Sequence, residues 1–180
     1  MWFSVFYGTG RTGINQKHGA DAGMEDKMKV QTKFFGEIDL PEEKIIYLDR
    51  GLIGLEQYKK YTILYDEEKE DSNISWFQSC DEPTLALPVI KPWLVMEEYN
   101  PTVEDELLKN IGEITEDNLV ILLTMTVPED ITKMSVNLKA PIVINADTRK
   151  GAQIIAENDD YEVKYMVYDL FKKKNEEAGV

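Results

Sequence analysis

Short apolar runs separated by turn signals constrain the fold of this chain more than any other feature of its sequence. From Lys29 onward, runs rich in β-branched and aromatic residues alternate with polar stretches that carry glycine, proline or aspartate. Many short strands at regular spacing, with little helix between them, are typical of a closed or nearly closed β-barrel. Pro88 interrupts one run and predicts an edge or a bulge there, because proline cannot donate to a strand ladder. The expected strands are 30–35, 44–48, 61–65, 75–79, 85–90, 118–127, 133–138, 140–145 and 151–155.

One segment has the pattern of a helix, at about residues 102–111. Thr102 is a suitable N-cap, and acids follow it in the first turn, where the helix dipole favours them. Val103, Leu107 and Ile111 share one face at helical spacing, and Gly112 ends the segment. We therefore predict a mainly β, single-domain, β-barrel-like fold with one short helix. The stretch 161–171 has an apolar period of uncertain type.

The first 28 residues differ in kind from the rest. They hold five of the eleven glycines, the only histidine (His18) and equal numbers of acids and bases. Such a breaker-rich stretch predicts a flexible or loosely docked leader, which we expect to be dispensable for folding. The predicted organisation is a leader at 1–28, a barrel domain at 29–171 and a frayed tail at 172–180.

Net charge restricts the partners. The chain carries 20 basic and 34 acidic residues, a net charge of -14. Nucleic acid is usually bound through Lys and Arg, so we expect no direct nucleic-acid contact. An acidic field attracts basic proteins, although solubility alone also explains it. Cys80 is the single cysteine, and no apolar run approaches the roughly 20 residues that a membrane span needs. These features favour a cytoplasmic protein without membrane contact.

The usual signs of catalysis are missing from the sequence of residues 29–180. That part has no histidine, and Cys80 next to Trp76 and Phe77 is interpreted as a buried structural thiol. The glycine-rich stretch 8–13 lacks the Lys-Ser/Thr element of a phosphate-binding loop. The acidic run 66–71 has the wrong spacing for a calcium loop. We predict no cofactor, no metal and no enzymatic activity; an enzyme that uses paired carboxylates remains an alternative.

Several blocks of the sequence resemble one known family. The match begins at Gln31–Ile38, continues at Gly51–Tyr58 (where the family usually has proline in place of Ile53), and then covers 76–79 and 85–90. The longest block runs from Val127 to Asn145 and on into 148–153. In this order the blocks are similar to those of the FliW family of flagellar assembly factors. The leader lies outside the resemblance, and the tail is longer and more charged than the family pattern.

The resemblance implies a function in protein binding. FliW proteins have a β-barrel-like fold and bind two partners in turn, flagellin and the RNA-binding translational regulator CsrA. FliW that is not occupied by flagellin binds CsrA, which then releases the flagellin message so that translation resumes. We expect the free protein to be a monomer. The alternative from another class is an acidic nucleic-acid mimic that inhibits a basic protein by charge alone.

Candidate contact residues come from two sources. The segment 97–117 carries eight acids against Lys109 alone, and we predict that it forms part of the field that repels RNA phosphate; a solvated helix face is the alternative. The second source is the set of polar residues in the longest block that a barrel interior does not require. Turn formation also explains Glu129, Asp130 and Asn145. Lys139, Arg149 and Lys150 are candidate anchors for acidic stretches of flagellin. The apolar block residues Phe34, Phe35, Trp76, Val136 and Ile144 are assigned to the core. The full candidate set is Glu104, Asp105, Glu106, Glu129, Asp130, Lys133, Asn137, Lys139, Asn145, Arg149 and Lys150.

Overall fold

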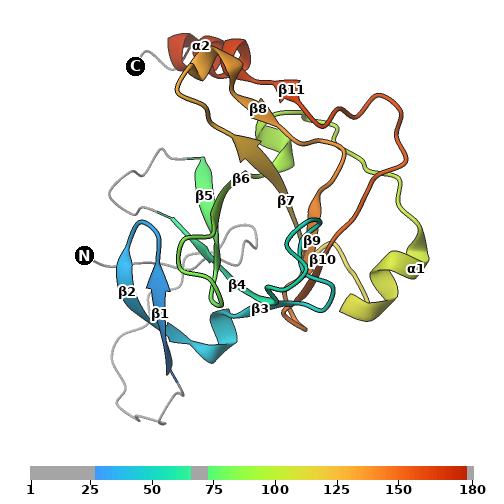
Figure 1. Cartoon of the computed structure of the whole chain (residues 1–180). Helices are drawn as coiled ribbons and strands as arrows, with labels where there is room; N and C mark the ends of the chain where they lie inside the picture. Colours follow the sequence, from blue (N-terminus) through green and yellow to red (C-terminus); the bar gives the residue numbers. More distant parts are fainter. Residues whose placement is uncertain (1–26, 66–72, 178–180) are drawn as a thin grey trace, which may run out of the picture.

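The computed structural model describes residues 27–65 and 73–177 (Figure 1). The predicted leader therefore lies outside the described residues up to position 26, and so does the acidic run 66–71. The strands are β1 (Lys27–Thr32), β2 (Gly36–Pro41), β3 (Ile46–Leu48), β4 (Lys60–Leu64), β5 (Ile74–Ser79), β6 (Ala86–Ile90), β7 (Leu119–Thr126), β8 (Ser135–Val136), β9 (Ile142–Asn145), β10 (Lys150–Gln153) and β11 (Tyr165–Met166). The helices are α1 (Asp105–Leu108) and α2 (Tyr168–Glu177), with short 3-10 turns η1 (Glu42–Lys44), η2 (Pro92–Leu94), η3 (Lys109–Ile111) and η4 (Ile131–Lys133).

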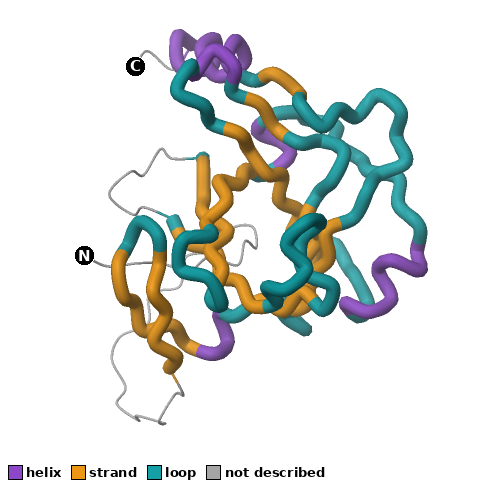
Figure 2. Tube along the Cα trace, viewed as in Figure 1, coloured by secondary structure: helices purple, strands orange, loops and turns teal. Residues whose placement is uncertain are grey.

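Seven strands close into a ring, which confirms the predicted barrel. The order around the ring is β3-β4-β5-β6-β7-β9-β10, and β10 returns to β3 (Figures 1 and 2). The β10–β3 pair is parallel and the other pairs of the ring are antiparallel. Closure leaves no free edge along a fully paired wall, so any break in a ladder exposes backbone groups.

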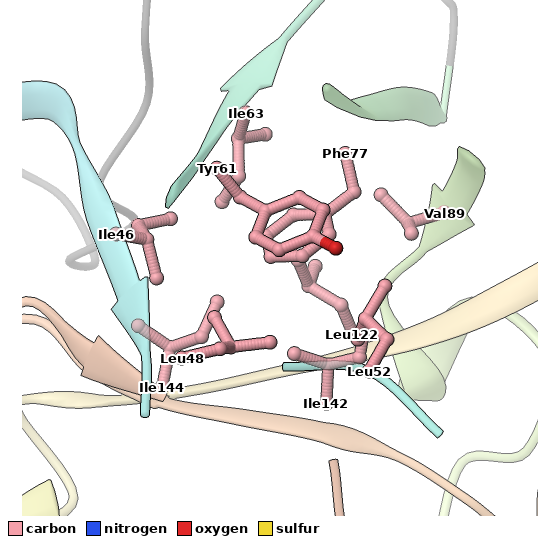
Figure 3. Close-up of a cluster of buried hydrophobic side chains, with 10 residues drawn as sticks. All are labelled: Ile46, Leu48, Leu52, Tyr61, Ile63, Phe77, Val89, Leu122, Ile142 and Ile144. Atoms are coloured by element: carbon pink, nitrogen blue, oxygen red, sulfur yellow. The ribbon is translucent and has the colours of Figure 1, made fainter. Parts of the chain in front are cut away.

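A cluster of apolar side chains fills the ring (Figure 3). Tyr61 and Phe77 stack in it with ring centroids 4.6 Å apart, and both are fully buried. Ile144 from β9 is also fully buried, as the sequence predicted. The other buried members are Ile46, Leu48, Leu52, Ile63, Val89, Leu122 and Ile142.

A second layer covers one end of the ring. β8 continues the sheet beyond β7 and pairs with β11, and α2 follows directly (Figure 1). Leu170 and Phe171 of α2 pack against a second buried cluster that includes Val136. The sequence predicts only one helix and a tail frayed from Lys172, whereas α2 continues to Glu177. Contacts of its first turn with the second cluster supply the stability that the weak periodicity of this stretch does not predict.

The β1–β2 hairpin forms a separate two-stranded sheet. The run 30–35, predicted as one strand, ends at Thr32, whose hydroxyl accepts from the amide of Phe35 (3.0 Å) and donates to the carbonyl of Gly36 (2.8 Å). Gly36 has a φ of 67°, which favours glycine. The core assignment of Phe34 is wrong: its side chain is 51% exposed, because it lies in this turn and packs on Trp76 from outside.

The predicted helix is shorter than its pattern suggests. α1 begins at Asp105 with Glu104 as N-cap, so Thr102 does not cap it, and the chain continues as η3 to Ile111. Gly112 ends the segment with a φ of 95°. The apolar face predicted from Val103, Leu107 and Ile111 packs against Val143 and Ile154, on the outside of the barrel wall.

Two prolines limit the contact between β6 and β7. The amide of Ser79 donates to the carbonyl of Leu85 (2.9 Å), so odd-numbered residues of β6 bond to β5. Pro88, Ile90 and the following Pro92 therefore face β7, and only Ile90 has an N–H to donate. The β6–β7 ladder accordingly consists of two residue pairs. The expected edge or bulge at Pro88 is wrong, because β6 lies between β5 and β7 and Pro88 pairs with Trp76 in regular register; instead, the ladder of β6 with β7 is short.

Candidate functional site

The acidic segment lies on the surface. All eight acids between positions 97 and 117 are exposed, including Glu104, Asp105 and Glu106 at the start of α1. Lys109 forms an ion pair with Glu106 one turn away. Because the apolar side of this segment is held against the barrel, its carboxylates face solvent and present negative charge to any approaching protein.

Hydrogen bonds fix the end of the acidic segment to the β9–β10 turn. Asn145 is only 1% exposed; its amide donates to the carbonyl of Glu113 (2.8 Å), and its side-chain oxygen accepts from the amides of Asp147 (3.0 Å) and Thr148 (3.1 Å). The hydroxyl of Thr148 donates to the carbonyl of Ile111 (2.7 Å). Asn145 therefore shapes the turn, which is the alternative that the sequence left open.

The two basic residues of this turn differ in their surroundings. Arg149 has a φ of 58° and donates from its guanidinium to the carbonyl of Glu42 (2.8 Å). Its own carbonyl accepts from the amide of Tyr47 (2.8 Å), which joins the turn to β3. Lys150 is exposed. Thus the fold brings two predicted anchors next to the acidic segment.

A second group of candidates lies around η4, next to the second layer. Asp130 caps η4 by accepting from the amide of Thr132 (3.2 Å), and it pairs with Lys133 (3.1 Å). The hydrogen bond from the Thr132 hydroxyl, followed by the one from Lys133, lowers the pKa of Asp130 below its usual value. Glu129, Asp130 and Lys133 are all exposed, so they are accessible to a partner as well as being part of a turn.

The remaining candidates hold the connection from β8 to β9. The side-chain oxygen of Asn137 accepts from the amide of Ala140 (2.9 Å). The ammonium of Lys139 donates to the carbonyl of Asn158 (2.6 Å), and both Asn137 and Lys139 are half-buried. Apart from the buried Asn145, the predicted residues thus form two surfaces rather than one: α1 with the β9–β10 turn, and η4 with the β8–β9 connection. Whether a partner contacts either surface stays a prediction.

The described residues include one thiol, that of Cys80, and no cluster of metal-binding side chains. Within residues 27–65 and 73–177, no group of three or more His, Cys, Asp or Glu side chains is placed to hold a metal ion. Burial raises the pKa of the Cys80 thiol to about 12, with the charge of Asp81 acting in the same direction, so the thiol stays protonated at neutral pH. None of the described helices is long and apolar enough to cross a membrane.

An apolar groove is the surface feature that the sequence did not predict. It has a volume of about 400 Å³ and lies where β6 separates from β7. Trp93, which is 57% exposed, stands at this groove with the Lys91 ammonium 5.3 Å from its ring centroid. The spacing of Pro88 and Pro92 was the signal in the sequence that could have located it. The lining residues are Ile63, Tyr65, Asn73, Ser75, Val89, Ile90, Lys91, Trp93, Leu94 and 119–122.

Two buried hydroxyls, those of Tyr61 and Thr62, have no hydrogen-bond partner among the described residues, and that of Tyr61 belongs to the cluster that fills the barrel. The Tyr61 hydroxyl is fully buried and makes no hydrogen bond among the described residues. In Figure 3 it points toward Val89 and Leu122, two members of the core that also line the groove. Burial raises the pKa of Tyr61 to about 12, with Asp81 adding to the effect.

Comparisons with known proteins agree on one family. A family model described as "FliW protein" matches residues 29–167. A flagellar assembly factor FliW of Lachnospira eligens is 58% identical over 149 residues, which cover 82% of this chain and 99% of the relative. One of Lachnoclostridium phytofermentans is 53% identical over 148 residues, 82% of this chain and 95% of the relative. A crystal structure titled as that of the flagellar assembly factor FliW superposes with a TM-score of 0.70 at 28% identity, covering 78% of this chain and 96% of that chain.

Proposed function

The chain belongs to the FliW family of flagellar assembly factors, and from this premise we propose that it acts by binding two proteins in turn, flagellin and a CsrA-type translational regulator. Flagellin occupies the protein while flagellin accumulates in the cytoplasm. Export of flagellin frees the protein, which then binds the regulator and releases the flagellin message for translation. No bond is made or broken in this cycle.

The single observation that supports this mechanism is the exposed acidic segment on α1 and its flanks. A regulator that binds RNA carries basic residues, and acids attract such a surface and accelerate its encounter. Once bound, carboxylates within about one Debye length, roughly 8 Å at physiological salt, repel RNA phosphate without covering every base contact. Eight exposed acids with Lys109 as the one basic residue between positions 97 and 117 suit this role.

The experiment that tests the proposal is a competition assay with the full chain. The protein is titrated into a complex of the regulator with flagellin message RNA, at low and at physiological salt, and RNA release is followed. The variant Glu104→Gln, Asp105→Asn, Glu106→Gln removes three exposed charges. We expect it to release RNA roughly tenfold less effectively at low salt, with a smaller difference at high salt.

A matched control removes the same charge from a different surface. Asp159→Asn, Asp160→Asn and Glu162→Gln also neutralise three exposed acids, beyond the acidic segment. Equal loss in both triple variants would favour the acidic mimic, whose inhibition depends on net charge. Unchanged release in the α1 variant would remove the acidic segment from the mechanism. Added flagellin should restore RNA binding by the regulator; if it does not, the two partners do not exclude each other and the switch is refuted.

A further inference from the structure

The acidic segment is held to the barrel by hydrogen bonds on both sides of α1. After the helix, Asn145 and Thr148 of the β9–β10 turn donate to the carbonyls of Glu113 (2.8 Å) and Ile111 (2.7 Å). The helix itself has four residues, too few to be stable in isolation, and within the described residues no side chain caps it. The position of the exposed acids at the start of α1 therefore depends on what holds the chain before them.

The side chain of Asn158 holds the chain that enters α1. Its oxygen accepts from the amide of Thr102 (2.6 Å), and its NH₂ group donates to the carbonyl of Asn100 (3.2 Å). The amide of the neighbouring Glu157 also donates to the carbonyl of Thr102 (2.8 Å). One side chain thus bridges two backbone groups of the acidic segment, just before the acids that begin at Glu104.

Asn158 is itself fixed in place. Its carbonyl accepts from the ammonium of Lys139 (2.6 Å) and from the amide of Tyr161 (3.3 Å). The hydroxyl of Tyr161 accepts from the amide of Asn100 (2.8 Å), and its ring stacks on that of Tyr99 with centroids 4.8 Å apart. Because Tyr161 is buried in the second cluster, these contacts connect Asn158 to the core.

The way the segment is held affects what its charge can do. Repulsion between a carboxylate and a phosphate is screened beyond about one Debye length, roughly 8 Å at physiological salt, so its strength depends on where the acid lies. A segment that is already ordered also binds a partner without the entropic cost of ordering it on contact. Loss of the Asn158 bridge would leave the acids exposed but free to move away from a bound partner.

We propose that Asn158 is a positioning residue, which holds the acidic segment in the conformation that meets the basic regulator. This inference rests on the proposed function, which assigns the regulator to this segment. Asn158 acts through the backbone of residues 100–102 and needs no contact with the regulator itself. Lys139 supports it by binding the Asn158 carbonyl.

The test compares Asn158→Ala with a matched control, Gln153→Ala, in the full chain. Gln153 is half-buried like Asn158 and also bridges two backbone groups: it accepts from the amide of Ile53 (2.9 Å) and donates to the carbonyl of Ala140 (3.2 Å). Both variants lose one accepted and one donated hydrogen bond, but those of Gln153 lie outside the acidic segment. A second variant, Asn158→Asp, keeps an acceptor for the Thr102 amide. Circular dichroism checks the fold of each variant.

Hydrogen exchange measures the positioning directly. The amide of Leu107 donates to the carbonyl of Glu104 (3.0 Å), a bond within α1 that involves no atom of Asn158. Asn158→Ala should speed exchange at Leu107 by about threefold to tenfold, Asn158→Asp should speed it less, and Gln153→Ala should leave it unchanged. Unchanged exchange at Leu107 in both Asn158 variants, or an equal increase in Gln153→Ala, would overturn the proposal.

The competition assay with the regulator and message RNA gives the functional readout. At low salt, Asn158→Ala should release RNA about threefold to tenfold less effectively than the wild type, and Gln153→Ala should match the wild type. If the triple variant of α1 weakens release but Asn158→Ala does not, the positioning role is refuted and the proposed function stands. If the wild-type chain releases no RNA, the proposed function itself is refuted, and exchange at Leu107 alone decides whether Asn158 positions the segment.

Discussion

The β9–β10 wall of the barrel and the β6–β7 wall close in different ways. β9 and β10 form four residue pairs, and Gly151 allows β10 to approach its neighbours closely. β6 and β7 form two pairs, bracketed by Pro88 and Pro92. Glycine in one wall permits close packing, while proline in the other removes backbone donors. A barrel can therefore stay closed as a ring although one of its ladders is short.

Of the measurements that follow, thiol reactivity should show the largest difference, between a cysteine placed at the groove and the native Cys80. Ser75→Cys places a thiol at the groove, whereas burial raises the pKa of Cys80 to about 12. With an ordinary pKa near 8.5 for the new thiol, its thiolate fraction at pH 8 exceeds that of Cys80 by roughly 10³-fold. Stopped-flow labelling with a disulfide reagent measures both rates, and denatured protein is the control. Similar rates in the folded protein would show that the groove is closed.

Truncating two paired residues of the barrel should lower the free energy of unfolding by different amounts. Val120 and Ile144 are register partners on β7 and β9, but Ile144 is fully buried and Val120 is half-buried at the groove. Ile144→Ala should lower the free energy of unfolding by about 2–5 kcal/mol, because it leaves a cavity in a closed wall. Val120→Ala should cost about 1 kcal/mol or less, since its surroundings are already open. Urea denaturation measures both, and equal losses would contradict the comparison.

Filling the space at Gly151 should destabilise the closed wall. A Cβ at this position would lie 3.1 Å from the Val143 carbonyl oxygen and 3.1 Å from Cγ1 of Ile144. Backbone atoms yield little, so Gly151→Ala should cost about 1–3 kcal/mol in urea denaturation. Lys150→Ala, on the same strand but exposed, should stay within about 0.5 kcal/mol of the wild type. A neutral Gly151→Ala would show that this wall packs less closely than its geometry indicates.

Removing the Tyr61 hydroxyl should have the smallest effect and the opposite sign. The group is buried without a hydrogen bond among the described residues, so Tyr61→Phe should raise the free energy of unfolding by about 1 kcal/mol at pH 7. The pKa of Tyr61 is raised to about 12 in the folded state, so the unfolded state loses its proton first. Stability is therefore present below about pH 10 and is lost as the pH rises toward 12. The variant should lose less stability than the wild type over this range; an identical pH profile would show that the hydroxyl is solvated.

Several features were readable from residue order alone, because they depend on local chemistry. The alternation of apolar and polar residues and the turn residues between runs predicted the strands of the ring. Sequence blocks from Gln31 onward identified the family. The buried positions of Val136 and Ile144 follow from the same pattern. β2 was not predicted, since its glycine and acids are poor strand formers, and it is stabilised instead by pairing with β1.

The other features of the fold were decided by contacts between segments that are distant in the sequence. α2 is stabilised because Leu170 and Phe171 pack against a cluster assembled from several strands, and no local period in the sequence encodes this contact. From the sequence alone, Asn145 is a candidate for partner contact because it is polar. In the fold it shapes a turn, and its side-chain amide donates to the carbonyl of Glu113. The groove has the same origin: the sequence contains Pro88 and Pro92, but only the pairing of β6 with β7 in the fold limits their ladder to two residue pairs. A strand ladder needs two segments of the chain, so its length is determined by the tertiary structure and not by either segment alone.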